Sequence, residues 1–102
     1  MGNKINREKI SSLVVKSLIC YFEDINLPIN LNEGEQTKLF GGEGLLDSMG
    51  LVSFIVTVEE AIEDEFNISV VLADEKAMSR RTSPFSRISY LVDYIFEVLN
   101  KD

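Results

Sequence analysis

Histidine is absent from the sequence and cysteine occurs once, and these shortages exclude several kinds of catalytic chemistry. Without histidine there is no Ser-His or Cys-His pair for nucleophilic catalysis, and the commonest side-chain ligand of transition metals is missing. Cys20 has no second cysteine with which to form an internal disulfide. Because it lies in a helical pattern between Ile19 and Tyr21, we expect a buried structural thiol. From these residue types we expect neither an enzyme nor a metal site.

Long apolar runs and an excess of positive charge are also missing. The longest apolar stretches fall far short of the roughly 18 residues that span a bilayer, and no apolar signal-peptide core follows Met1. We therefore expect a cytoplasmic protein that does not insert into a membrane. Seventeen acidic residues against ten basic ones give a net charge of −7. This charge disfavours nucleic acid as a partner and favours proteins with basic surfaces.

What is present is the composition of one ordinary folded domain. The chain has 102 residues, of which 45% are hydrophobic and 26% are charged, a balance typical of globular proteins rather than disordered ones. This length fits a single domain over residues 1–102, and we expect a monomer.

Three segments repeat apolar residues at the spacing of one helical face, over residues 7–22, 48–66 and 88–99. The apolar stripes are Ile10, Leu13, Val14, Leu18 and Tyr21; then Leu51, Phe54, Ile55, Val58 and Ile62; then Ile88, Leu91, Val92, Ile95 and Leu99. Ser86 is a candidate cap for the third helix, and residues 74–78 a candidate short helix capped by Asp74. The sequence thus predicts an all-α fold, a small bundle of three main amphipathic helices plus one short helix.

Residues 24–46 are predicted to form a long, mostly irregular loop, because Pro28 and several Asn, Glu and Gly residues oppose a helix. Loops of this length are uncommon in small domains unless they have a function, so we expect apolar residues to hold this one against the core. The candidate anchors are Leu27, Ile29, Leu39, Phe40 and Leu45.

The most informative stretch is a glycine-rich segment, residues 41–44, followed by Asp47 and Ser48 where the second helix begins. In one interpretation, Asp47 or Ser48 only caps the helix by accepting a backbone N–H bond. In the other, a phosphate esterified to Ser48 is stabilised by the amides and the positive dipole end of the helix N-terminus. The stretch lacks the Gly-Lys-Ser/Thr ending of a nucleotide-binding loop and the first glycine of a hydrolase nucleophile elbow.

The segment Leu46-Asp47-Ser48-Met49 resembles the Asp-Ser-Leu motif of the acyl carrier protein family. The resemblance also covers the acidic end of the second helix, residues 58–66, and the closing helix, residues 88–95. It implies an acyl-carrier-like bundle in which Ser48, with Asp47 as its motif neighbour, receives a 4′-phosphopantetheine arm donated by coenzyme A. A phosphopantetheinyl transferase would attach the arm, and the arm would carry acyl groups as thioesters.

Three features depart from the usual pattern of that family. Met49 stands where leucine is common, Gly50 where the fatty-acid carriers often have an acidic residue, and the second helix is longer by about one turn of ~3.6 residues. The pathway implied is fatty-acid, lipid or specialised metabolite synthesis. An aminoacyl carrier of the D-alanyl or peptidyl type is a close alternative. A noncatalytic helical interaction domain is another; there Ser48 is only a cap, and Ser48→Ala costs roughly 1 kcal/mol of stability.

The outer face of the second helix is the expected partner surface. At ~100° per residue, Ser53, Val56, Glu60 and Asp64 lie opposite the apolar stripe, and Val52, Glu59 and Glu63 lie on one flank. With Met49, these residues are the candidate contacts for acyl-loading and acyl-transferring enzymes that have basic surfaces.

Overall fold

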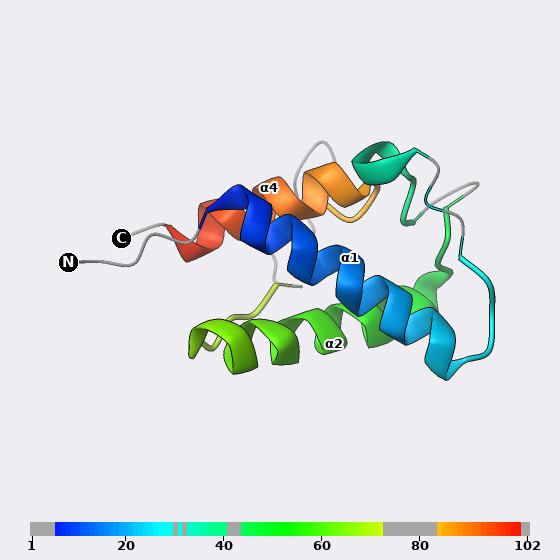
Figure 1. Cartoon of the computed structure of the whole chain (residues 1–102), viewed down its shortest axis with the longest axis horizontal. Helices are drawn as coiled ribbons and strands as arrows, with labels where there is room; N and C mark the ends of the chain where they lie inside the picture. The colour runs from blue at the N-terminus through cyan, green and yellow to red at the C-terminus, as the bar shows by residue number, and fades with distance from the viewer. Residues whose placement is uncertain (1–5, 30, 32, 41–43, 73–83, 101–102) are drawn as a thin grey trace.

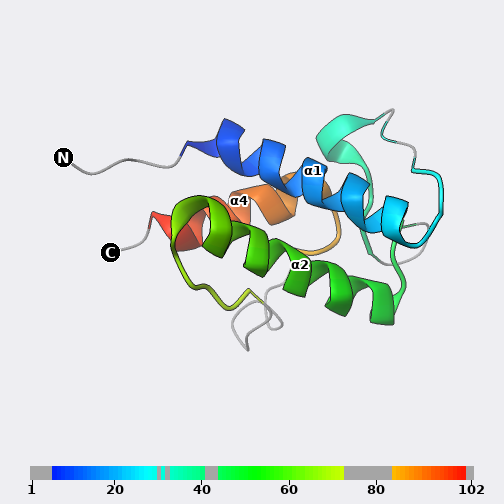
Figure 2. The same cartoon turned by 60° about the horizontal axis from the view of Figure 1, so that its bottom comes forward.

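The computed structural model describes residues 6–29, 31, 33–40, 44–72 and 84–100. Within these ranges the chain forms a helical domain with α1 (Arg7–Asp24), a short 3₁₀ helix η1 (Gly34–Gln36), α2 (Ser48–Phe66) and α4 (Ile88–Leu99). α1 runs antiparallel to α2, and both α2 and α4 pack against α1 (Figure 1 and Figure 2). The three predicted long helices are confirmed. The short helix expected over residues 74–78 lies outside the described residues.

Polar side chains cap the starts of α1 and α2. The Asn6 side chain accepts a hydrogen bond from the backbone N–H of Lys9 at 2.8 Å. The Asp47 carboxylate accepts one from the backbone N–H of Gly50 at 2.7 Å. Each bond satisfies one of the first backbone N–H groups of its helix, which have no partner within the helix.

The start of α4 is held by the long loop instead of a side-chain cap. Arg87 occupies the cap position without a side-chain cap bond, so the prediction that Ser86 caps this helix was wrong. The backbone N–H of Ile88 donates to the carbonyl of Thr37 at 3.2 Å, and the N–H of Leu39 donates to the carbonyl of Ser86 at 2.8 Å. The loop therefore does the capping that Ser86 was expected to do.

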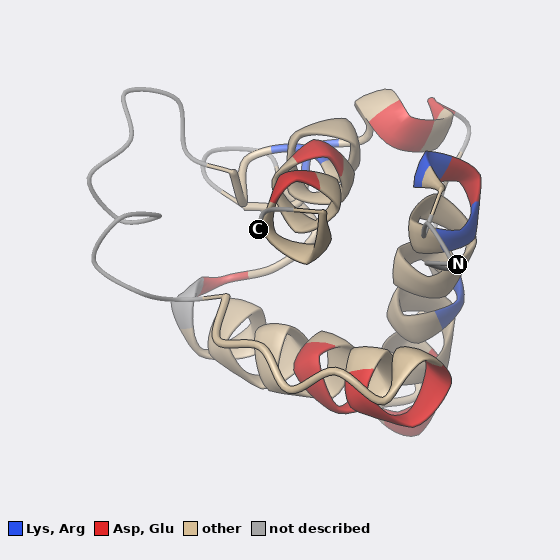
Figure 3. Ribbon diagram, turned by 90° about the vertical axis from the view of Figure 1, so that its left-hand side faces the viewer, with Lys and Arg blue, Asp and Glu red and all other residues tan. Residues whose placement is uncertain are grey.

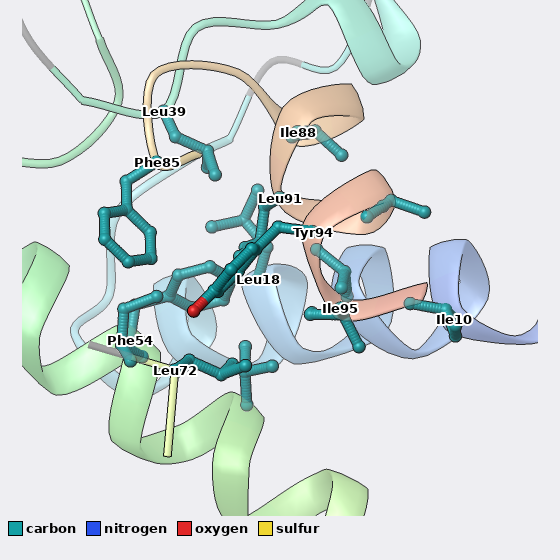
Figure 4. Packing of buried hydrophobic residues seen from close by; sticks show 14 of the residues in the cluster. Ile10, Leu18, Leu39, Phe54, Leu72, Phe85, Ile88, Leu91, Tyr94 and Ile95 are labelled. Atoms are coloured by element: carbon teal, nitrogen blue, oxygen red, sulfur yellow. The ribbon is translucent and has the colours of Figure 1, made fainter. Parts of the chain in front are cut away.

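The inner faces of the three helices form one hydrophobic core (Figure 4). Most of the predicted stripe residues are fully buried, and the rest are half-buried at its edge. The buried stripe residues are Ile10, Val14, Leu18, Phe54, Ile55, Val58, Ile62, Ile88, Leu91, Val92 and Ile95. Leu39 and Leu72 reach the same core from the connecting segments.

Two burial predictions were wrong. Cys20 is exposed. It follows the buried Leu18 by two residues, which is a rotation of about 200° around the helix, so it faces away from the core. Leu27 is 54% exposed and does not anchor the loop. The other predicted anchors, Ile29, Leu39, Phe40 and Leu45, do pack into or against the core.

An ion-pair network ties the start of α1 to η1 and α4. The Arg7 guanidinium lies 2.8 Å from a Glu35 carboxylate oxygen and 2.6 Å from an Asp93 carboxylate oxygen. The Ser11 hydroxyl donates to the other Glu35 oxygen at 2.5 Å. The hydrogen bond from Arg7 and, to a smaller extent, that from Ser11 hold the pKa of Glu35 below its ordinary value. The network thereby fixes the middle of the long loop against the helices.

Candidate functional site

Ser48 is the first residue of α2 and follows directly after the helix cap. The cap is Asp47, whose backbone is extended and whose carboxylate is bonded to Gly50. The structure thus distinguishes the two residues that were predicted as possible caps. Asp47 caps the helix, and Ser48 is already inside it.

The loop that leads into Ser48 is held close to the core by its own backbone. The N–H of Leu46 donates to the carbonyl of Leu39 at 2.7 Å, and the N–H of Leu45 donates to that of Lys38 at 3.0 Å. A Cβ at Gly44 would lie 2.6 Å from the backbone nitrogen of Phe40, which no side chain tolerates. Glycine at position 44 therefore allows the chain to fold back, and the buried Leu46 then fixes the approach to α2.

Gly50 lies where the C-terminal end of α1 meets the first turn of α2. A Cβ at this position would lie 3.1 Å from a carboxylate oxygen of Asp47 and 3.3 Å from the hydroxyl oxygen of Tyr21. Tyr21 in turn packs edge-to-face against Phe54, with ring centroids 6.2 Å apart. The glycine thus leaves room for the Tyr21 hydroxyl beside the start of α2.

Tyr21 is a site residue that the sequence interpretation missed. It was assigned only to the apolar stripe of the first helix, and its ring is indeed half-buried against the core. The missing acidic residue at position 50 was the available signal, because a glycine early in a helix often marks the close approach of another group.

An open groove of about 290 Å³ lies between the end of α1, the loop and the start of α2. Figure 1 shows these segments side by side at one end of the domain. We call this feature the Tyr21 groove. Its lining residues are Tyr21, Phe22, Ile25, Leu27, Leu45, Leu46, Asp47, Met49, Gly50 and Ser53. Ser48 stands in the chain between lining residues, so the groove borders the candidate attachment position.

The outer face of α2 has two chemically different zones. Nearest to Ser48, three apolar side chains are exposed: Met49 at 82%, Val52 at 65% and Val56 at 47%. The acidic residues lie in the C-terminal half of the helix, where Figure 3 shows them gathered. Glu60 begins this zone about 18 Å along the helix from Ser48, at ~1.5 Å per residue. A partner that contacts both zones must pair an apolar patch with a basic one.

Most of the predicted partner-surface residues are accessible on this face. Ser53, Glu60, Glu63 and Asp64 are all exposed, in addition to the three apolar residues of the first zone. Their accessibility agrees with the helical spacing. It does not by itself identify a partner.

Glu59 differs from its acidic neighbours, because its carboxylate is used inside the domain. It is half-buried and accepts a hydrogen bond from the backbone N–H of Leu72 at 2.7 Å. Leu72 is fully buried in the core. This bond fixes the segment after α2, and it could not be predicted from local sequence patterns because Leu72 is 13 residues further along the chain.

Two further observations on the described residues concern membrane-spanning helices and metal sites. No helix in the described ranges is both long and apolar enough to cross a membrane. Nor do the described residues bring together three or more His, Cys, Asp or Glu side chains that could hold a metal ion.

A comparison with protein-family models, with curated proteins and with solved structures finds no match for this chain. The interpretation of the site therefore depends on its own residues and geometry.

Proposed function

We propose that this chain is an acyl carrier protein and that Ser48 is the attachment residue for a 4′-phosphopantetheine arm. The observation that supports this proposal is that Asp47 and Ser48 have different positions at the start of α2. Asp47 caps the helix and Ser48 follows at the first helical position. The side-chain cap of α2 is thus supplied by Asp47, and the helix end that Ser48 opens has a positive partial charge. A phosphodiester at this position is electrostatically favoured.

The residues around Ser48 fit such an arm. Gly50 adds no side chain beside the attachment position, and Met49 is an exposed apolar neighbour. Backbone hydrogen bonds at Leu45 and Leu46 tie the chain before Ser48 to residues 38 and 39 of the loop. When bound, the arm supplies a terminal thiol that carries the acyl group as a thioester. The protein itself would provide the attachment point at the start of α2, and the chemistry would belong to its partner enzymes.

The two zones of α2 are the proposed contact surface for those enzymes. A phosphopantetheinyl transferase and the acyl-transferring enzymes would place apolar side chains on Met49, Val52 and Val56, and basic side chains near Glu60 and Glu63. The net charge of −7 would accelerate the encounter with a basic partner, and salt would slow it. We expect the protein to act as a monomer in the cytoplasm.

Loading with a phosphopantetheinyl transferase tests the proposal. Wild type, Ser48→Ala and Ser53→Ala are incubated with coenzyme A, magnesium and a transferase of broad specificity, and their intact masses are measured. Ser53 is the matched control, because it is an exposed serine on the same helix. The proposal predicts one added arm on wild type and on Ser53→Ala, and none on Ser48→Ala. If folded wild type gains no mass with several transferases, the chain is better explained as a noncatalytic helical interaction domain.

A further inference from the structure

The Tyr21 groove borders Ser48 but has no role in the function proposed above. We propose that it holds the near half of the arm, the pantoyl portion next to the phosphate, rather than the acyl cargo. This inference rests on the proposed function, since it concerns a group attached to Ser48. It assigns the end of α1 and the loop, and not only α2, to the binding of the arm.

Position along the chain supports this choice of occupant. Asp47, Met49 and Gly50 all line the groove, so a group esterified to Ser48 begins at the edge of the groove. The pantoyl portion follows the phosphate directly, whereas the acyl group is at the opposite end of the arm. The groove is therefore within reach of the first part of the arm without any folding back.

The size of the groove supports the same choice. Its volume of about 290 Å³ is at the lower limit of pockets that hold whole small molecules, which are commonly about 300–1,000 Å³. A fragment of the arm fits such a space. The complete arm with a long acyl chain does not.

The chemistry of the lining matches the pantoyl group. This group has two methyl groups on one carbon, next to a hydroxyl and an amide. The side chains of Leu27 and Met49 offer exposed apolar surface that two methyl groups would cover, which is favourable in water. The Tyr21 hydroxyl can donate or accept a hydrogen bond from the polar neighbours of those methyl groups.

Gly50 keeps this polar group accessible. A side-chain Cβ at this position would lie 3.3 Å from the Tyr21 hydroxyl oxygen and would crowd it. An acidic residue at position 50 would also bring a negative charge beside a phosphodiester. The glycine and the tyrosine thus act together in the proposed site.

Nuclear Overhauser effects (NOEs) in the full chain test the inference. Wild type is compared without the arm, with the arm alone, and with the arm carrying an octanoyl group. We expect NOEs from the arm's geminal methyl groups to Leu27 and to the Tyr21 ring, unchanged when the octanoyl group is added. Leu27 and Tyr21 are the informative reporters, because Met49 is next to the modified residue and would change in any case. Val71, exposed on another part of the chain, is the control and should show none.

Two variants sharpen the test without disturbing the core. Leu27→Gln changes an exposed side chain and should weaken the methyl NOEs, and Tyr21→Phe keeps the ring while removing the hydroxyl. A loaded protein whose arm methyl groups show no NOE to Leu27 or Tyr21 would overturn the inference. NOEs from the octanoyl chain in place of the arm methyl groups would also overturn it. Failure of the proposed function is recognised separately, because no arm is then added.

Discussion

The capping geometry at the start of α2 predicts unequal stability effects for substitutions at two neighbouring residues. Asp47→Ala removes the carboxylate that accepts the Gly50 N–H bond at 2.7 Å. Loss of such a cap typically costs about 1 kcal/mol, within a range of about 0.5–2 kcal/mol. Ser48→Ala removes a hydroxyl from the first helical position and introduces a better helix former, so its effect should stay within about 0.5 kcal/mol.

Urea unfolding followed by circular dichroism measures both effects. For a domain of this size, a loss of 1 kcal/mol also lowers the melting temperature by about 4–8 °C. Asp47→Asn is the matched control, because asparagine caps helices about as well as aspartate and should keep most of the stability. If Ser48→Ala destabilised the protein as much as Asp47→Ala, Ser48 would also have a capping role, and the assignment of the side-chain cap to Asp47 alone would be refuted.

Three further predictions follow from other contacts. Glu35 has a lowered pKa in the folded state. Its contribution to the free energy of unfolding should therefore be lost as the pH falls below about 4.3, the ordinary pKa of a glutamate, and Glu35→Gln should make the acid unfolding curve flatter in that range. Glu59→Ala should speed hydrogen exchange at the Leu72 amide, measured by NMR, because that N–H loses its acceptor. Gly50→Ala should not give the stabilisation of roughly 1 kcal/mol usual for this change within a helix, because the new Cβ crowds Tyr21.

Each of these predictions has its own control. Glu33→Gln replaces an exposed carboxylate in the same loop as Glu35, and it should leave the acid unfolding curve unchanged. Glu60→Ala, next to Glu59 but exposed, should not alter exchange at Leu72; equal effects from both variants would argue against the bond. The double variant Gly50→Ala with Tyr21→Phe should recover part of the stabilisation in urea unfolding, since the Asp47 carboxylate oxygen 3.1 Å from the new Cβ remains. No recovery would mean that the Tyr21 hydroxyl is not what crowds position 50.

The sequence was sufficient to predict the three long helices because their apolar spacing is a local property. The stripes that contain Leu18, Ile62 and Ile95 are buried or half-buried, as their periodicity requires. The same periodicity could have predicted the exposure of Cys20, since it lies about 200° around the helix from Leu18. The prediction that Cys20 is buried instead followed the general tendency of cysteine to be buried.

The contacts that shape the candidate site were not predictable, because they join residues far apart in the sequence. The approach of Tyr21 to Gly50 and the bond from Leu72 to Glu59 both depend on how the elements pack. The capping of α4 by the loop carbonyl of Thr37 has the same origin. Helical spacing placed Glu59 on one flank of the outer face of the helix and could not show that the chain after α2 folds back onto it.

The most direct test of the central claim is to locate the arm on the chain. After incubation with coenzyme A and a phosphopantetheinyl transferase, the protein is digested, and tandem mass spectrometry identifies the modified residue. We predict a single phosphopantetheine on Ser48, at the first position of α2. An arm on any other serine, or an unmodified peptide from folded protein under conditions that load a known carrier, would contradict the proposed function.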